Sequence, residues 1–511
     1  MNADDIIASG TPIACHPWPR RLLTPAAWTT LSASLANTTD PELLGLWADT
    51  AEVHAIWHDH GAFALCSVPV SAGTYAALSP HRPAAAWFER MIFDLWGHRA
   101  EGGTDARPWL DHGRWGIASP LSPRPPPRPG APEPMEFLPV EADDFHQIPV
   151  GPVHAGIIEP GHFRFSAQGE TVIRLELRLG WLHKGTLGLM RGKSPRAAAR
   201  FAARLSGDST VAHGIAFARA AEAACNVAPP PAAIVLRGVM GELERLANHL
   251  GDCGTVTGDT AFAWLPARFG RHRETILAAC ATAFGHRLMM DAVIPGGVAT
   301  GLAPGGAEDL LDALSTVETE LPALLSAYEN HASLIDRVVG TGIVAPALAA
   351  RFAPGGFVGR ASGRDFDVRR QPGYPPYTAL DVSTPILQAG PTLQAGPILQ
   401  AGDVDARVRI RLAEITRSIA LVRTLLTNLP DGPLSLQLPM ASGEGLGWAE
   451  GFRGDAWYWL RLDGGLIGAV FLRDPSWLQW PLIETAILGN IVADFPLINA
   501  SFNCSYSGVD L

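Results

Sequence analysis

With 511 residues, 47% of them hydrophobic and 17% charged, the chain is long enough for two or three domains around a large buried core. A net charge of −11, without any run rich in lysine and arginine, argues against a protein that binds nucleic acid. The six cysteines are scattered outside metal-binding spacings, which favours free thiols and a reducing, cytoplasmic setting. No signal peptide and no apolar run of about 18 residues is visible, so we expect no membrane-spanning segment.

The first part of the chain is predicted to mix strands and a helix. Residues 52–57 and 62–69 are rich in apolar side chains and are bounded by turn signals, which is typical of strands. Residues 84–97 follow as a helix, in which Glu89 and Arg90 stand among tryptophan and phenylalanine. Such a pair more often belongs to a helix packed on a sheet than to a catalytic site.

This helix resembles the signature of the C-type subunit of NADH-quinone oxidoreductase, a docking domain without a cofactor. The resemblance predicts a small α/β domain over residues 1–118. A proline-rich linker over residues 119–146 follows, because its prolines favour a stiff, extended backbone. The matching residues are Phe88, Glu89, Arg90, Asp94, Leu95 and Gly97.

The second unit, residues 147–511, opens with a turn-rich segment that contains three candidate site residues. This opening resembles the large subunit of the energy-converting, membrane-bound nickel-iron hydrogenases and the D-type subunit of NADH-quinone oxidoreductase. The resemblance implies a proton-transferring role for Glu159 beside His162, and it places His154 in the loop that reaches the quinone cavity of the D-type subunit. The alternative is that these histidines only stabilise turns.

Residues 204–213 resemble the first metal-binding motif of the hydrogenase large subunits, which carries two cysteines and a later histidine. Here the two cysteine positions hold Ser206 and Ser209. A neutral hydroxyl does not replace a thiolate, because soft sulfur ligands hold nickel and low-spin iron. The residues that do fit are Arg204, Leu205, Gly207 and His213.

The second half of such a metal site would lie in residues 493–511, which resemble the closing segment of the family. The two cysteine positions of that segment fall on Ser505 and Gly508, and Cys504 stands alone one position earlier. The two segments together supply one cysteine, whereas a nickel-iron centre needs four thiolate ligands. The sequence therefore predicts a hydrogenase-like scaffold that binds no metal, in which the Arg204 stretch and the tail still lie side by side.

The rest of the second unit is predicted to be mainly helical with peripheral β-hairpins. Residues 171–178 and 457–472 have the pattern of strands, and residues 237–250 and 408–429 have apolar side chains at helical spacing. A further helix is predicted to begin at Arg271. The Glu/Arg pairs on these helices are more typical of structural ion pairs than of catalytic groups.

Residues 357–370 form a glycine-rich, charged loop that resembles the family's Gly-Arg-Ala-Ser-Gly loop. In the hydrogenases this loop lines the active-site cavity, so the resemblance makes Arg360 and Asp365 candidate pocket residues. A solvated loop is the alternative. Residues 385–402 then repeat a six-residue unit three times, which predicts a duplicated surface loop rather than a solenoid.

Together these resemblances imply an α+β chain that fuses C-like and D-like units within a membrane-associated complex. A working hydrogenase is excluded by the missing thiolates. Two roles stay open: a quinone-related protein that couples electrons and protons, or a metal-free scaffold or assembly component of an ion-translocating complex. The expected partners are an iron-sulfur small subunit of the B type, which would hold the cluster, and membrane ion-translocating subunits at the inner face of the cell membrane. The chain itself would bind no metal. A pocket built from Glu159, His162, Ser206, Ser209 and Arg360 would accept a quinone, and NAD binding is implied only for the family as a whole.

Overall fold

The computed structural model describes residues 2–128, 130, 134–140, 144–154, 158–260, 262–383 and 402–511. It contains both helices and antiparallel sheets, so the predicted α+β class is confirmed. The repeated segment at 385–402 lies outside the described residues except for its last glycine. Within the described ranges, every helix is too short or too polar to cross a bilayer.

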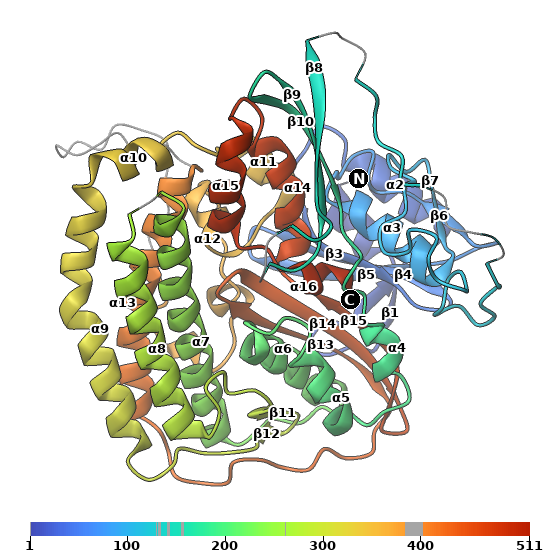
Figure 1. Ribbon diagram of the computed structural model, residues 1–511. Coiled ribbons are helices and arrows are strands. Elements are labelled where there is room, and N and C mark those ends of the chain that lie inside the picture. Colours follow the sequence, from blue (N-terminus) through green and yellow to red (C-terminus); the bar gives the residue numbers. More distant parts are fainter. Residues whose placement is uncertain are drawn as a thin grey trace.

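The N-terminal part of the chain forms a five-stranded sheet in the order β1-β2-β5-β4-β3, seen in blue in Figure 1. All pairs are antiparallel except β2 with β5. A short parallel pair, β6 with β7, lies beside this sheet. The strands are β1 (Thr11–Ile13), β2 (Arg20–Leu22), β3 (Glu42–Ala48), β4 (Glu52–Asp59), β5 (Ala62–Pro69), β6 (Thr74–Ala76) and β7 (Arg99–Glu101). The helices are α1 (Ala3–Ala8), α2 (Pro25–Ser34) and α3 (Ala85–Trp96).

Helix α3 packs on this sheet, and its charged residues are structural. The carboxylate of Glu89 accepts the backbone N–H groups of Leu78 and Ser79 at 2.7 and 3.0 Å. Asp94 accepts the N–H group of Trp109 at 2.7 Å. Gly97 ends the helix with φ of 77°, a left-handed conformation that glycine adopts without strain. The prediction of a helix packed on a sheet is confirmed.

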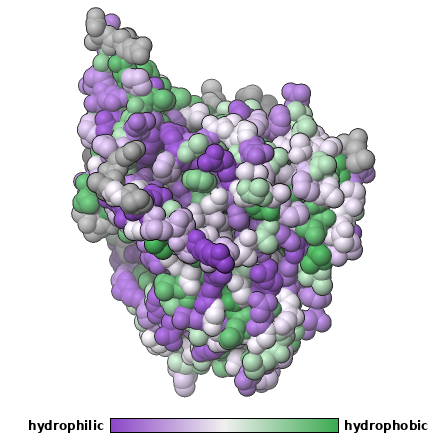
Figure 2. Space-filling model, turned by 90° about the vertical axis from the view of Figure 1, so that its right-hand side faces the viewer, coloured by the Kyte–Doolittle hydropathy of each residue, from purple (hydrophilic) through white to green (hydrophobic). Residues whose placement is uncertain are grey.

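The N-terminal sheet is joined to the rest of the molecule by a buried interface. The Trp47 ring stacks on Phe471 with 4.7 Å between ring centroids. The guanidinium of Arg20 donates to both carboxylate oxygens of Glu444 at 2.7 and 2.8 Å. Figure 2 shows the side of the molecule on which this N-terminal part lies, with polar and apolar side chains interspersed over the described surface.

A three-stranded sheet forms the centre of the second part of the chain, with helix α6 lying along it. Gly445 and Gly447 of β13 allow this close approach. A Cβ atom on Gly447 would lie 2.3 Å from the carbonyl oxygen of Ala216 on α6, so any larger residue would push the helix away. The elements are β13 (Gly443–Gly451), β14 (Gly454–Asp463), β15 (Leu466–Arg473), α4 (Thr186–Met190), α5 (Pro195–Ala202) and α6 (Thr210–Ala224).

Four long helices form a bundle at one side of the molecule, at the left in Figure 1. Helix α8 begins at Trp264, so the predicted start at Arg271 is wrong by seven residues. Pro266 occupies the first turn of this helix, where its missing N–H group costs nothing. The bundle consists of α7 (Pro231–Gly258), α8 (Trp264–Phe284), α9 (Gly306–Glu329) and α13 (Val404–Thr427).

The chain ends near the middle of the ribbon, beside α16, and the remaining elements are spread around the bundle and the central sheet (Figure 1). Leu511 is fully buried, and its carbonyl oxygen accepts the N–H group of Thr186 at 3.0 Å. The predicted hairpin belongs to an antiparallel sheet of β8 (Phe145–Val150), β9 (His162–Gln168) and β10 (Thr171–Arg178). The others are β11 (Val293–Ile294), β12 (Gly297–Val298), α10 (Ala332–Val338), α11 (Pro346–Phe352), α12 (Gly356–Ala361), α14 (Ser476–Ala486), α15 (Phe495–Phe502) and α16 (Tyr506–Asp510), with short turns at Arg369–Gly373, Tyr377–Ala379 and Val492–Asp494.

Candidate functional site

The two segments that would hold a metal centre meet in the structure, as predicted. Ser206 lies in the loop before α6, and Ser505 lies at the N-terminus of α16. Their hydroxyl oxygens are 2.9 Å apart although the residues are 299 positions apart in the chain. The Ser505 hydroxyl also accepts the N–H group of Gly508 at 2.9 Å and so caps α16.

The guanidinium of Arg453 lies against the serines of the first motif. Arg453 comes from the tight turn between β13 and β14 and is 3% exposed. Its NH1 group donates to Asp208 Oδ1 at 2.8 Å, to Ser209 Oγ at 3.1 Å and to Ser206 Oγ at 3.4 Å. Its NH2 group donates to Asp208 Oδ2 at 2.5 Å. We call Ser206, Asp208, Ser209, Arg453 and Ser505 the serine–arginine cluster.

The charges of this cluster balance each other. Burial alone would raise the pKa of the Asp208 carboxyl, but the charge and hydrogen bonds of Arg453 outweigh burial and hold that pKa below its ordinary value. The same attraction outweighs burial for Arg453 and raises the pKa of its guanidinium. Asp208 therefore stays a carboxylate and Arg453 a cation at neutral pH.

The donor set does not fit a nickel-iron centre. Ser206, Ser209 and Ser505 offer neutral hydroxyls, and Gly508 offers no side chain. Cys504 is the one sulfur of the tail, and burial raises the pKa of its thiol far above neutrality, so it stays protonated. Its Sγ atom lies 3.8 Å from the amide oxygen of Gln479.

Glu159 reaches the cluster through the C-terminal helix. Its Oε2 atom accepts the N–H group of Ser507 at 3.1 Å. The hydroxyls of Ser507 and Ser505 are 3.4 Å apart, and the Ser505 hydroxyl contacts Ser206, whose own hydroxyl donates to Asp208 at 2.8 Å. A chain of hydroxyl groups therefore runs from the residue that binds Glu159 to the Asp208 carboxylate.

A second buried polar group lies beside the cluster. His213, the last residue of the first motif, has its Nε2 atom 2.9 Å from Asp474 Oδ2 and its Nδ1 atom 3.1 Å from the hydroxyl of Tyr458. The pKa of Asp474 lies at about 2, because the hydrogen bond to His213 outweighs burial. Gly508 packs against this carboxyl, and a Cβ atom there would lie 2.6 Å from Asp474 Cγ.

Solvent reaches the cluster from the side of the helix bundle. The side chain of Asp208 is 35% exposed to solvent, whereas that of Arg453 is 4% exposed. A cavity of about 500 Å³ opens there between α7 and α8, and Asp208, Asp252 and Asn503 line its inner end. The carboxylate of Asp208 is therefore the member of the cluster that a molecule in this cavity would meet.

The two histidines predicted for the site lie outside the cluster. His162 is on β9, where Nδ1 lies 3.2 Å from the carbonyl oxygen of Gly151 and the ring packs on Phe137. His154 packs edge-on against Phe163, and its Nε2 atom has no partner among the described residues. Burial lowers the pKa of both imidazoles, so both are neutral at pH 7. Of the three candidates in this opening, Glu159 is the one that contacts the C-terminal helix carrying Ser505.

Arg360 belongs to a different buried network. It donates through Nε to Glu414 at 2.9 Å and through NH1 to Glu450 at 3.3 Å. Within the described residues, no contact joins it to Ser206 or Ser209. Asp365 is exposed and pairs with Arg370 at the surface, whereas Asp367, two positions later, is 2% exposed and pairs with the buried guanidiniums. The assignment of Asp365 to the pocket wall is corrected accordingly.

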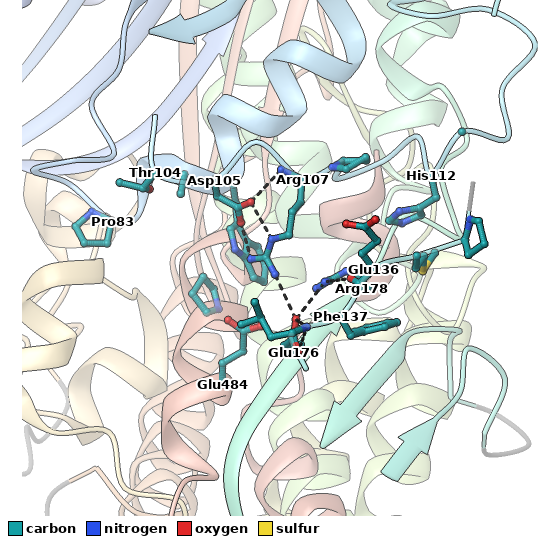
Figure 3. A pocket seen from close by; sticks show the side chains of 18 of the residues that line it. Pro83, Thr104, Asp105, Arg107, His112, Glu136, Phe137, Glu176, Arg178 and Glu484 are labelled. Carbon is teal, nitrogen blue, oxygen red and sulfur yellow. Dashed lines mark hydrogen bonds and ion pairs between the residues drawn. The ribbon is translucent and has the colours of Figure 1, made fainter. Parts of the chain in front are cut away.

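A cavity of about 1100 Å³ lies between the N-terminal part and the second part of the chain (Figure 3). Its charged side chains pair with one another. Arg107 contacts Asp105 at 2.6 Å and Glu176 at 3.6 Å, and Arg178 contacts Glu176 at 3.3 Å. Glu484 lies at its wall, and burial raises the pKa of this carboxyl to about 7. Ion pairs therefore neutralise part of this lining, whereas Glu484 forms none among the described residues.

Sequence patterns missed three members of the site. Asp208 stood between the two serines of the motif and could have been recognised there. Arg453 lies in a Gly-Phe-Arg-Gly-Asp segment that follows the family order, which marks a turn but not its partner. Asp474 precedes a proline, and no local pattern connects it with His213.

A helical bundle lies against a central antiparallel sheet, and the C-terminal residues meet the loop before α6. Residues 256–441 match the family model of the respiratory-chain NADH dehydrogenase 49 Kd subunit. The chain is similar to subunits of complex I-related hydrogenases and to the D-type subunit of NADH-quinone oxidoreductase.

The relatives cover most of this chain. Formate hydrogenlyase subunit 5 of Escherichia coli (strain K12) is 28% identical over 453 residues, which are 85% of this chain and 77% of that protein. The carbon monoxide-induced hydrogenase of Rhodospirillum rubrum is 28% identical over 357 residues, 69% of this chain and 96% of that protein. The D-type subunit of NADH-quinone oxidoreductase from Dehalococcoides mccartyi is 27% identical over 371 residues, 71% and 97% of the two chains.

A solved structure supports the fold. A chain of the membrane-bound sulfane sulfur reductase, an archaeal respiratory membrane complex, superimposes with a TM-score of 0.65 and 22% identity. The match covers 73% of this chain and 100% of that chain. It therefore supports the backbone arrangement of most of this molecule.

Proposed function

We propose that this chain is the large subunit of a complex I-related, membrane-associated oxidoreductase that works without a nickel-iron centre. The observation that supports the proposal is the serine–arginine cluster: three hydroxyls and a glycine stand at the positions of the four thiolates, and the Asp208–Arg453 ion pair lies against them. Its relatives are named as subunits of hydrogenases and of NADH-quinone oxidoreductases. The D-type relatives are the ones whose name refers to a quinone, and a quinone is our preferred electron acceptor.

In this proposal the chain supplies protons to the reaction. Reduction of a quinone to a quinol takes two electrons, which an iron-sulfur partner protein would deliver, and two protons. The hydroxyls of Ser507, Ser505 and Ser206 would relay protons to Asp208, whose carboxylate borders the cavity between α7 and α8. Glu159, which accepts the backbone N–H group of Ser507, would start the transfer by turning its carboxyl group to the Ser507 hydroxyl. Each hydroxyl accepts one proton and releases its own, so the chain is restored after rotation of the hydroxyls. Membrane ion-translocating subunits would use the energy released, with this chain on the cytoplasmic face.

The experiment begins with the purified intact complex. We expect less than about a tenth of a nickel atom per copy of this chain by mass spectrometry, and stoichiometric nickel would overturn the proposal. Reduction of a short-chain quinone by a dithionite-reduced viologen dye then measures turnover. Loss of a positioned proton donor typically lowers rates by about 100-fold or more. We expect a loss of that size in Glu159→Gln and a smaller loss in Ser206→Ala.

Two controls sharpen this assay. Glu170→Gln changes an exposed glutamate in the β9–β10 turn and should leave turnover unchanged. His162→Ala tests the alternative assignment of the proton donor, and we expect less than about a threefold effect because its ring packs on Phe137 away from the cluster.

A scaffold role is the second candidate. It is favoured by the complete ion pairing of Asp208 with Arg453, since a structural pair needs no exchange of protons. Unchanged turnover in both Glu159→Gln and Ser206→Ala, in a complex that assembles normally, would support the scaffold over the proton path.

A further inference from the structure

Arg219 of helix α6 holds an unusual position for a positive charge. Its guanidinium lies against two aromatic rings, 4.5 Å from the centroid of Tyr374 and 4.7 Å from that of Trp448. Within the described residues it makes no hydrogen bond or ion pair, and its Nε atom is buried without an acceptor. Most buried donors in folded proteins have a partner, so a guanidinium without one requires an explanation.

The nearest carboxylate of the same helix is already engaged. Glu222 accepts two hydrogen bonds from Arg237 at 2.5 and 3.1 Å and one from the N–H group of Gly296 at 2.8 Å. The Glu222 carboxylate therefore attracts the Arg219 guanidinium from a distance and does not contact it. Burial accordingly lowers the pKa of the Arg219 guanidinium to about 10, which still leaves it charged at neutral pH.

Arg219 lines a cavity of about 270 Å³. Glu222 and Arg237 line the same cavity and pair with each other at 2.5 Å. The other walls are mostly apolar and include Ile234, Pro375 and Leu446. Trp448 lines the same cavity, and its indole N–H is a further donor without an acceptor in the described part of the chain. The one carboxylate of this lining, Glu222, is engaged by Arg237, so the positive charge of Arg219 borders a mostly apolar cavity without an ion-pair partner among the described residues.

We propose that this cavity binds a small carboxylate with an apolar body. A planar guanidinium pairs with the two oxygens of a carboxylate through parallel hydrogen bonds, and the NH1 and NH2 groups of Arg219 make no hydrogen bond within the described residues. The apolar walls favour a short aliphatic or aromatic body over a second charged group. The volume lies below the range of roughly 300 to 1000 Å³ that is usual for drug-sized ligands, which limits the ligand to a small acid. The site is independent of the serine–arginine cluster and of the proposed proton path.

Benzoate and butyrate are suitable probes, with benzamide as the neutral counterpart of benzoate. Thermal unfolding of the purified complex would be followed with each compound from about 0.1 to about 20 mM, because a ligand that binds only the native state raises the midpoint. We expect benzoate to raise the midpoint of the wild-type protein and benzamide to bind at least about tenfold more weakly. Inorganic phosphate, which lacks an apolar body, should also bind at least about tenfold more weakly than benzoate.

Three variants decide between a ligand site and a structural stack. Arg219→Met should abolish the effect of benzoate. Arg219→Lys, which keeps the charge but not the planar fork, should weaken binding at least about tenfold. Arg351→Met, a change of an exposed arginine on α11, should leave it unchanged. Circular dichroism would verify that each variant is folded. Equal benzoate shifts in wild type and Arg219→Met, no shift with either carboxylate, or tighter binding of phosphate would each overturn the proposal.

Discussion

Removing the guanidinium of Arg453 should loosen the contact between the loop before α6 and the turn of the central sheet. Arg453→Met keeps the length of the side chain but loses two charge-assisted bonds to Asp208 and the bonds to Ser206 and Ser209. Breaking one partner of a buried ion pair costs about 3–5 kcal/mol. Asp208 keeps 35% of its side-chain exposure, so water partly solvates the stranded carboxylate and we expect a loss at or below the lower end of that range, about 2–3 kcal/mol.

A double-mutant cycle isolates the pair itself. Asp208→Asn strands the buried guanidinium, and the double variant removes both charges, so the two single losses should exceed the joint loss by about 1.5–3 kcal/mol. The assay is urea-induced unfolding of the purified protein followed by tryptophan fluorescence, with the same slope in all four proteins. The matched control is the surface pair Arg204–Asp291, with both partners nearly half exposed and N–O distances of 2.6 Å. There the coupling should stay below about 1 kcal/mol. Equal coupling in the two cycles would refute the claim that the buried cluster holds these segments together.

Three further predictions concern buried carboxyls and a close backbone contact. The pKa of Glu484 is about 7 against an ordinary 4.5, so its destabilising effect on folding begins as pH rises above 4.5 and is complete above 7. The Glu484→Gln variant should therefore be more stable than the wild type by up to about 3 kcal/mol at pH 8. The two proteins should be equally stable near pH 4, and unfolding measured across pH checks both values. Asp474 has a pKa of about 2 against 3.8, so its stabilisation is present above 3.8 and is lost as pH falls through 2; Asp474→Asn should lose about 2 kcal/mol at pH 7 and nothing near pH 2, and a pH-independent loss would refute the role of His213. Gly447→Ala should cost about 3 kcal/mol in urea unfolding because its methyl group meets the backbone of Ala216, whereas an unaltered midpoint would mean that α6 can move away freely.

Sequence patterns predicted elements where side-chain periodicity was undisturbed. The long apolar stripe before residue 429 became α13, and the alternating strands after residue 454 became β14 and β15. The start of α8 was wrong because Pro266 and Gly270 resemble helix breakers. A proline in the first turn and an exposed glycine are both compatible with a helix, and packing against α7 decides the outcome.

The site was predictable only where a motif fixes the backbone. Ser206 and Ser505 were placed by family motifs, and their contact is confirmed. The residue that binds both serines of the first motif could not be found in this way. Arg453 stands 247 positions from Ser206, and its neighbours in sequence indicate a turn and nothing about its partner.

The two aspartates after Arg360 show why register matters more than residue type in an irregular loop. Asp365 and Asp367 follow the same glycine-rich segment, and either could have met the guanidiniums of the buried network. The backbone turns Asp367 inward to Arg369 at 2.7 Å and leaves Asp365 in water. Residues two positions apart in an extended strand point to the same face, but this loop has no such regular alternation of side chains. A motif match therefore predicts that such a loop packs against the core. Only the three-dimensional path of the backbone decides which of its carboxylates is buried there.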